Sequence, residues 1–209
     1  LLRMIKEQGL IKGHDHFPVY VDSPLAVEAT EIYSSNLTDY FDDETLSLLE
    51  KGINPIQFPG LKLSVTSEDS VQINVDKSPK IIISASGMCE AGRIRHHLKH
   101  NLWRPENTIL FVGYQAEGTL GRMILEGASF VRLFGENVQV KAHIENFEGI
   151  SSHADKEMLL GWLSGFDKKP KTVFVNHGGD TVCDEFAATI EERLAISATA
   201  PYNGAEYDL

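Results

Sequence analysis

Two histidines occupy positions where a side chain can do chemistry. His153 lies between an expected strand and an expected helix, and His177 ends an apolar strand and precedes two glycines. A neutral imidazole can bind a metal ion or transfer a proton, and a partner on its second nitrogen fixes its orientation. Asp155 is near enough in sequence to orient His153 or to cap the following helix. A purely structural role for each histidine remains the alternative.

Two loops that follow buried strands carry a second set of polar residues. Their candidate phosphate contacts are Ser84, Ser86, Gly87, Gln115 and Glu117. The carboxyl ends of parallel strands bind ligands because loop amides and helix N-termini face outward there. We therefore expect strands 81–84 and 108–113 to be parallel neighbours, or near neighbours, in one sheet, with both loops opening on the same side. A turn that serves only packing is the alternative for the first loop, and Tyr114 is expected in the core.

The basic residues concentrate between residues 93 and 104, in a stretch without acidic residues. At helical spacing, four of them share one broad face: Arg93, His96, His97 and His100. Such a face can contact the phosphates of a nucleic acid, and a solvated helix surface is the alternative. Adjacent helical residues point about 100 degrees apart, which excludes His96 and His97 as a chelating pair.

The composition is that of an ordinary globular protein, with 42% hydrophobic and 23% charged residues. A net charge of −11 argues against binding nucleic acid through a broad basic surface, but it permits a local cluster or a metal site. No apolar run approaches the roughly 18 residues of a membrane span, and no signal peptide is expected. Two distant cysteines, Cys89 and Cys183, favour a reducing cytoplasm.

The elements that position these residues alternate along the chain. We expect strands at 17–21, 80–84, 108–113, 130–134, 138–147 and 172–176. We expect helices at 1–11, 25–36, 43–51, 92–99, 156–166 and 183–195, a further helix after Gly118 and a helical turn from Thr66. Uniformly apolar strands between helices predict an α/β fold with a parallel sheet. Beyond Gly127 apolar and polar residues alternate, which favours half-buried antiparallel strands and a boundary near residues 126–136.

Five segments together resemble the β-CASP branch of the metallo-β-lactamase superfamily. They are VDSPLA (21–26), SASGM (84–88) with Arg93, GYQAEGTL (113–120), SSHAD (151–155) and VNHG (175–178). They occur in the family's order over nearly the whole chain. The similarity is strongest to bacterial and archaeal relatives of the endonuclease that cleaves pre-mRNA. Asp22 is interpreted as part of a strand-to-helix junction and not as the family's acidic first motif.

The resemblance implies a parallel-sheet β-CASP domain at residues 1–126 and, at 127–209, the returning C-terminal lobe of a metallo-β-lactamase αββα domain. It implies that His153, with Asp155, assists catalysis and that His177 is a zinc ligand. A histidine at position 177 is associated with RNA-processing members, whereas DNA-repair members tend to carry valine. The implied RNA or phosphate contacts are Ser84, Ser86, Gly87, Arg93, Gln115, Glu117, Ser151 and Gly178.

The activity that the resemblance implies is hydrolysis of RNA phosphodiesters at a two-zinc site, in RNA processing or decay. The metal motif H-x-H-x-D-H is absent, so we expect a C-terminal fragment that is inert alone and does not fully coordinate zinc. Gly179 replaces the family's common glutamate, which changes a contact near His177. The open alternatives are a non-catalytic RNA-binding scaffold and a DNA-processing nuclease. Expected partners are RNA and, as an open alternative, a second copy in a homodimer, with no membrane.

Overall fold

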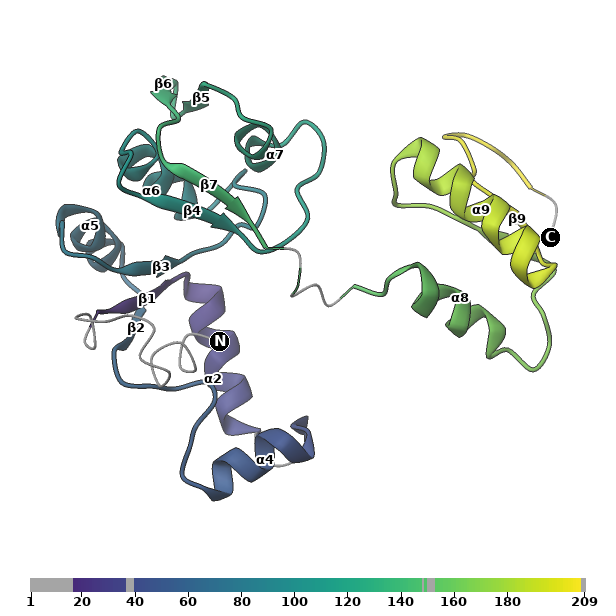
Figure 1. The fold of residues 1–209 in the computed structure, drawn as a ribbon, viewed down its shortest axis with the longest axis horizontal. Helices are drawn as coiled ribbons and strands as arrows, with labels where there is room; N and C mark the ends of the chain where they lie inside the picture. The colour runs from purple at the N-terminus through teal and green to yellow at the C-terminus, as the bar shows by residue number, and fades with distance from the viewer. Residues whose placement is uncertain (1–16, 37–39, 148, 150–152, 208–209) are drawn as a thin grey trace. The chain divides into compact units, whose positions relative to one another are not determined.

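The computed structural model describes residues 17–36, 40–147, 149 and 153–207 (Figure 1). Its contacts divide the chain into two compact units, Leu1–Ile150 and Ser151–Leu209. The helix expected at residues 1–11 and the candidate Ser151 lie outside the described residues. No helix within the described ranges is long and apolar enough to cross a membrane.

The first half of unit 1 is built on a three-stranded parallel sheet of order β2-β1-β3. Its elements are β1 (Val19–Asp22), α2 (Pro24–Ser35), α4 (Asp43–Glu50), β2 (Leu61–Ser64), α5 (Ser67–Val75) and β3 (Ile81–Ile83). Local signals define the helix starts. Ser23 accepts from Ala26 N and Pro24 takes the first turn of α2, while Thr66 and Asp69 form a capping box on α5.

The second half of unit 1 contains a parallel pair, β4 with β7, and an antiparallel hairpin, β5 with β6. Its elements are α6 (Ile94–Asn101), β4 (Thr108–Phe111), α7 (Leu120–Leu125), β5 (Phe130–Leu133), β6 (Glu136–Gln139) and β7 (His143–Asn146). A hydrophobic core joins them. Leu98, Leu102, Ile124 and Leu133 are completely buried in it.

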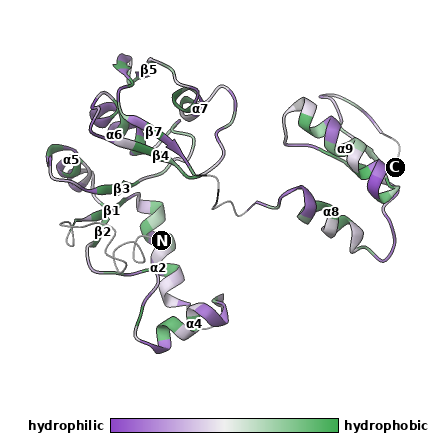
Figure 2. Ribbon diagram, in the orientation of Figure 1, coloured by the Kyte–Doolittle hydropathy of each residue, from purple (hydrophilic) through white to green (hydrophobic). Residues whose placement is uncertain are grey.

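Unit 2 is smaller and has a core of its own. It contains α8 (Lys156–Ser164), β8 (Thr172–Phe174), α9 (Asp180–Leu194) and β9 (Ser197–Thr199), and β8 pairs with β9 in parallel. Hydrophobic and hydrophilic stretches alternate along α9 (Figure 2). Its hydrophobic residues pack with α8 around Leu160, Leu163, Ile190 and Ile196.

The expected α/β class with parallel sheets is confirmed, but two expectations about pairing are wrong. Strands β3 and β4 lie in different sheets, because β3 pairs with β1 and β4 pairs with β7. Strand β7 was expected to be antiparallel and is parallel to β4. Alternation along a strand reports that one face is exposed, and it carries no information on the direction of the partner. The short strands β2 and β9 had no counterpart among the expected elements.

A buried carboxylate joins several elements of unit 1. Asp22, at the end of β1, is completely buried. Its Oδ1 accepts from Ser64 Oγ at 2.8 Å and from Arg93 Nη1 at 2.6 Å. Its Oδ2 accepts from Ser70 Oγ at 2.6 Å and lies 2.6 Å from His97 Nε2. One side chain therefore connects β1 with β2, α5 and the start of α6.

Ionisation of Asp22 follows from this environment. Burial by itself raises the pKa of Asp22, but the hydrogen bonds from Ser70, Ser64, His97 and Arg93 outweigh it and hold the pKa below its ordinary value of 3.8. Burial also lowers the pKa of His97 more than the carboxylate raises it. Arg93 supplies the counter-charge of Asp22, while the ring of His97 lies with Nε2 at the Asp22 carboxylate and Nδ1 3.0 Å from Asn74 Oδ1.

Removal of the carboxylate should destabilise unit 1 strongly. Asp22→Ala leaves the guanidinium of Arg93, which is 18% exposed, without its counter-charge, and about 3–5 kcal/mol, the cost for a fully buried pair, is the upper limit of the loss. We expect faster amide hydrogen exchange in β1, β2 and β3. The amides of α8 and α9 in unit 2 are the internal control and should keep their wild-type rates. Unchanged exchange in β1 would contradict the assigned role of Asp22.

The stabilisation should also depend on pH. Because folding lowers the pKa of Asp22, its contribution is complete above the ordinary pKa of 3.8 and is lost as the pH falls through the lower folded value. Asp22→Asn keeps the shape and removes the charge, so the acid limb of a stability–pH curve measured by urea unfolding should flatten.

Candidate functional site

Two loops of unit 1 are bonded to each other at the ends of β3 and β4. We call residues 84–92 the serine loop and residues 113–119 the glutamine loop. Gln115 Nε2 donates to Gly87 O at 3.0 Å, and Gly121 N donates to Met88 O at 3.0 Å. The carboxylate of Glu90 accepts from Leu120 N at the start of α7. The expectation that both loops open on the same side is therefore confirmed, although their strands lie in separate sheets.

Two glycines permit the close approach of these loops. A Cβ on Gly121 would lie 1.8 Å from Gln115 Oε1, and a Cβ on Gly92 would lie 2.6 Å from Ala85 O. Gly92 also has a φ of +73°, which L side chains rarely adopt. The loop positions therefore depend on the absence of side chains at residues 92 and 121.

Gln115 acts inside the loops and not at their surface. Its side chain is 3% exposed, and its Nε2 donates to the carbonyl oxygens of Gly87, Gly113 and Tyr114. Gly87, Tyr114 and Glu117 are among the residues of the two loops that are exposed. The expectation that Tyr114 fills the core is wrong, because its side chain is 73% exposed.

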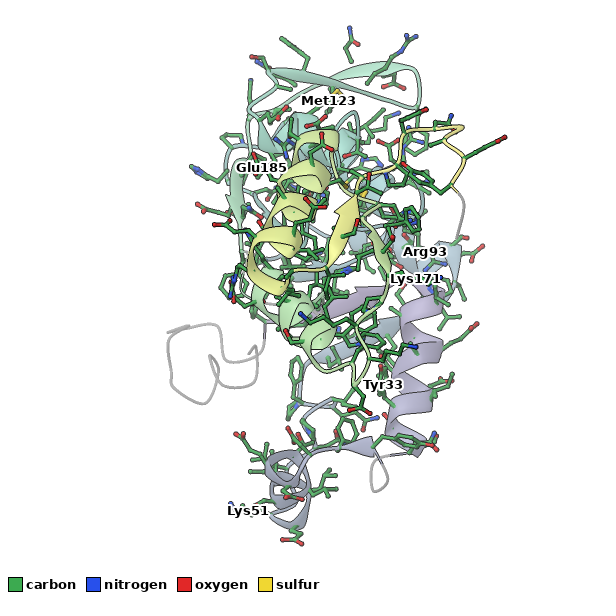
Figure 3. All side chains as sticks on the ribbon, turned by 90° about the vertical axis from the view of Figure 1, so that its right-hand side faces the viewer. Tyr33, Lys51, Arg93, Met123, Lys171 and Glu185 are labelled. Atoms are coloured by element: carbon green, nitrogen blue, oxygen red, sulfur yellow. The ribbon has the colours of Figure 1, made fainter. Side chains whose placement is uncertain are left out.

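Arg93 and Ser84 attach the serine loop to the buried carboxylate. Ser84 Oγ donates to Asp22 O at 2.9 Å. Arg93, labelled in Figure 3, donates from Nη1 to Asp22 and from Nη2 to Val65 O at 2.6 Å. Its side chain is 18% exposed. Both ends of the loop are therefore held by internal bonds.

The expected basic face of α6 divides in two. His97 is buried against Asp22, whereas His96 and His100 are exposed. The expectation that Arg93, His96, His97 and His100 share one basic face is therefore wrong, because the buried carboxylate of Asp22 binds Arg93 and His97.

Cys89, in the serine loop, has no role as a nucleophile. Burial, with a smaller contribution from Glu90, raises the pKa of its thiol to about 11. A thiol of that kind is protonated and inert at neutral pH.

In unit 2, His177 is exposed on a tight turn after β8. It has a φ of +64°, in the left-handed region. A Cβ on the next residue, Gly178, would lie 2.9 Å from Cys183 Sγ. The turn that carries His177 therefore lies directly against the first turns of α9.

His153 and Asp155 precede α8. Asp155 Oδ1 accepts from Met158 N at 2.8 Å and caps the helix, which is the capping role that the sequence had allowed. His153 is exposed two residues earlier. The cap fixes the point at which the chain leaves His153 and enters α8.

Zinc prefers imidazole, thiolate and carboxylate ligands, usually four in number. His177 is a ligand of the right type in an exposed position. Among the described residues, however, no group of three or more His, Cys, Asp or Glu side chains could hold a metal ion. Among the described residues, His177 is therefore one candidate zinc ligand, and the other ligands of a complete site are not found beside it.

Several residues that hold these loops and Asp22 in place were not among the sequence candidates. Glu90 caps α7, Gly121 makes room for Gln115, and Ser64 and Ser70 satisfy Asp22. A signal was present only for Asp22, since an aspartate at the end of an apolar strand needs partners if it is buried.

Two family models match the chain and define its class. The model of the Zn-dependent metallo-hydrolase RNA specificity domain matches residues 137–201. The model of the Beta-Casp domain matches residues 1–124. The chain therefore belongs to the β-CASP family of RNA-specific metallo-hydrolases.

Similar proteins come from bacteria and archaea. Ribonuclease TTHA0252 of Thermus thermophilus is 36% identical over 192 residues, which are 92% of this chain and 41% of that protein. Transcription termination factor FttA of Thermococcus kodakarensis is 30% identical over 210 residues, 97% of this chain and 32% of the relative. FttA of Methanosarcina mazei is 29% identical, with 96% and 32% covered. The chain thus spans 32–41% of the length of these relatives.

The turn at His177 can be tested through its packing. In a protein that contains this chain and the rest of a metallo-β-lactamase domain, Gly178→Ala should lower zinc content, because its Cβ displaces the turn from Cys183 Sγ. Cys183→Ala removes that sulfur, so the double variant should recover zinc relative to Gly178→Ala alone. Atomic absorption measures both. Equal zinc in the single and double variants would show that this contact does not position His177.

Proposed function

We propose that this chain is the β-CASP domain (residues 1–126) and the returning C-terminal lobe (residues 127–209) of a zinc-dependent ribonuclease. The enzyme hydrolyses RNA phosphodiester bonds in RNA processing or decay, and the chain alone is inactive. The observation that carries the proposal is His177, an exposed imidazole on a glycine turn within the residues matched by the RNA specificity model.

The two histidines have different roles in this proposal. His177 is a zinc ligand, held by a turn that Gly178 and Cys183 pack closely. Bound zinc supplies Lewis-acid activation of water and phosphate. His153 donates a proton to the departing ribose oxygen. Asp155 fixes the segment of His153 through its cap on α8.

The proposed RNA contacts fall into two groups. Ser86, Gly87 and Glu117 face solvent at least in part. Ser86 and Gly87, with Ser151 and the amide of Gly178, contact the phosphate backbone, whereas the carboxylate of Glu117 can only accept hydrogen bonds from RNA. Ser84, Arg93 and Gln115 hold the loops that present these contacts, since their side chains donate to the carbonyl oxygens of Asp22, Val65 and Gly87.

The proposed location is the cytoplasm. Cys89 and Cys183 are both free and buried, which a reducing compartment maintains. A histidine at position 177 is associated with RNA-processing members of the family, whereas DNA-repair members tend to carry valine. A DNA-processing nuclease is therefore the weaker candidate.

Variants of the whole ribonuclease separate the two roles. His177→Ala should lower zinc content and RNA cleavage together. His153→Ala should retain most zinc and slow single-turnover cleavage by roughly 100- to 10,000-fold, the usual contribution of a positioned general acid. Zinc analysis, melting temperature and cleavage of a labelled RNA give the three readouts.

Two other results have clear meanings. Near-normal cleavage by a folded His153→Ala protein would remove this residue from the catalytic group. RNA binding by the wild-type protein without zinc or cleavage would replace the nuclease with the RNA-binding scaffold.

The chain by itself should bind no stoichiometric, tightly held zinc. His177 provides one ligand, and a stable site needs about four, several of them from protein. Metal analysis after dialysis against micromolar zinc measures this. The expectation that the chain holds only part of the zinc site would be contradicted by one result. The wild-type chain would keep one equivalent of zinc after dialysis, and His177→Ala would keep none.

A further inference from the structure

The hairpin turn between β5 and β6 carries an aromatic side chain where backbone geometry disfavours one. Leu133 pairs with Glu136, so Phe134 and Gly135 form a two-residue turn, with φ values of +51° and +83°. Turns of this kind favour Asn-Gly or Gly-Gly, and a left-handed L residue is strained. Strain that is retained in a native fold points to a role for the side chain.

The Phe134 ring lies against cations and a second ring from α6. The rings of Phe134 and His96 stack at 4.4 Å between centroids, with 29° between planes. The guanidinium carbon of Arg95 lies 4.9 Å from the Phe134 centroid, and Lys99 Nζ lies 6.0 Å from it. Phe134 remains 44% exposed. Helix α6 lies beside the β5–β6 hairpin (Figure 1), and Phe134 contacts its side chains.

Further planar rings follow on α6 and just beyond it. His96 and His100 are one helical turn apart, and Trp103, which is 53% exposed, lies in the turn after Asn101, the last residue of α6. Burial, together with Lys77 and Lys99, lowers the pKa of His100, so its ring is neutral near pH 7. We call Arg95, His96, Lys99, His100, Trp103 and Phe134 the ring–cation surface.

The charge of this surface is opposite to that of the chain. No acidic residue occurs from 91 to 105, whereas the whole chain carries −11. One acid, Glu136, approaches from β6 and pairs with Lys99 at 2.7 Å. Within the described part of the chain, Arg95 forms no ion pair with an acidic side chain. A polyanion is therefore the complementary occupant.

We propose that the ring–cation surface binds single-stranded RNA, with bases stacked on its exposed rings and phosphates beside Arg95 and Lys99. Alternating rings and cations are how proteins hold single strands, because every base has a face that stacks. Paired bases in a duplex do not offer those faces. The inference rests on the proposed function in taking RNA as the substrate, and it adds a binding surface outside the catalytic loops.

A substitution at the turn separates binding from folding. Phe134→Asn removes the ring and introduces the residue that this turn prefers, so the melting temperature should stay equal or rise. The dissociation constant of this chain for a fluorescein-labelled 20-nucleotide poly(U) should rise roughly five-fold or more, the loss of one stacked base. Anisotropy measures the affinity.

A charge variant tests the cations independently of the turn. Lys99→Gln should weaken binding and reduce the slope of log affinity against log salt by about 0.7, the value for one phosphate contact on a single strand. Lys62→Gln is the matched control, because Lys62 Nζ also lies over an aromatic ring, 5.3 Å from the Tyr20 centroid, and belongs to β2. It should bind as the wild type does.

Several outcomes would overturn the proposal. It would be contradicted if Phe134→Asn and Lys99→Gln both bound poly(U) with wild-type affinity, or if Lys62→Gln lost as much affinity as they do. It would also be contradicted if an oligo-aspartate peptide or duplex RNA bound as tightly as poly(U). The test also stands apart from the nuclease proposal. If the whole ribonuclease cleaves RNA through His153 and His177 but this chain binds no RNA, only the proposed RNA-binding role of the ring–cation surface is contradicted. If the chain binds poly(U) through Phe134 but those histidine variants cleave normally, only the proposed catalytic roles fail.

Discussion

The carboxylate of Asp22 is the constraint on which unit 1 depends. A completely buried charge requires hydrogen-bond donors, and those donors come from β2, α5 and the start of α6. The serine loop connects β3 with α6, so bonds from Ser84 and Arg93 to Asp22 hold it at both ends. The sheet and the candidate RNA-binding loop therefore share one electrostatic anchor.

Close packing around two glycines also holds the candidate site segments in place. In unit 1 the absence of a side chain at Gly121 leaves room for Gln115, which joins the glutamine loop to the serine loop. In unit 2 the same device at Gly178 brings the turn of His177 against Cys183. Both places put candidate site residues on short, tightly packed segments, so small changes in neighbouring volume should displace them.

The sequence predicted the parts of the structure that depend on local chemistry. Ser23-Pro24 starts α2 and Thr66 caps α5, because capping acts within one turn of helix. Apolar strands correctly indicated parallel sheets. The partners of Arg93 and His97 could not be predicted, since a charge pattern identifies a helix face but not the carboxylate opposite it. The separate sheets of β3 and β4, and the exposed Tyr114, depend on tertiary packing in the same way. The roles of His153 and His177 came from family resemblance and remain predictions.

The contacts of Asp22 also bear on how the chain acquires its fold during synthesis. Arg93 and His97 lie 71 and 75 residues beyond Asp22, so the bonds that neutralise it close long loops. While a ribosome has released only β1 and its neighbours, the aspartate cannot be desolvated at tolerable cost. The first sheet should therefore stay loosely formed until α6 emerges. Unit 1 should then fold late and cooperatively, after α6 has been synthesised.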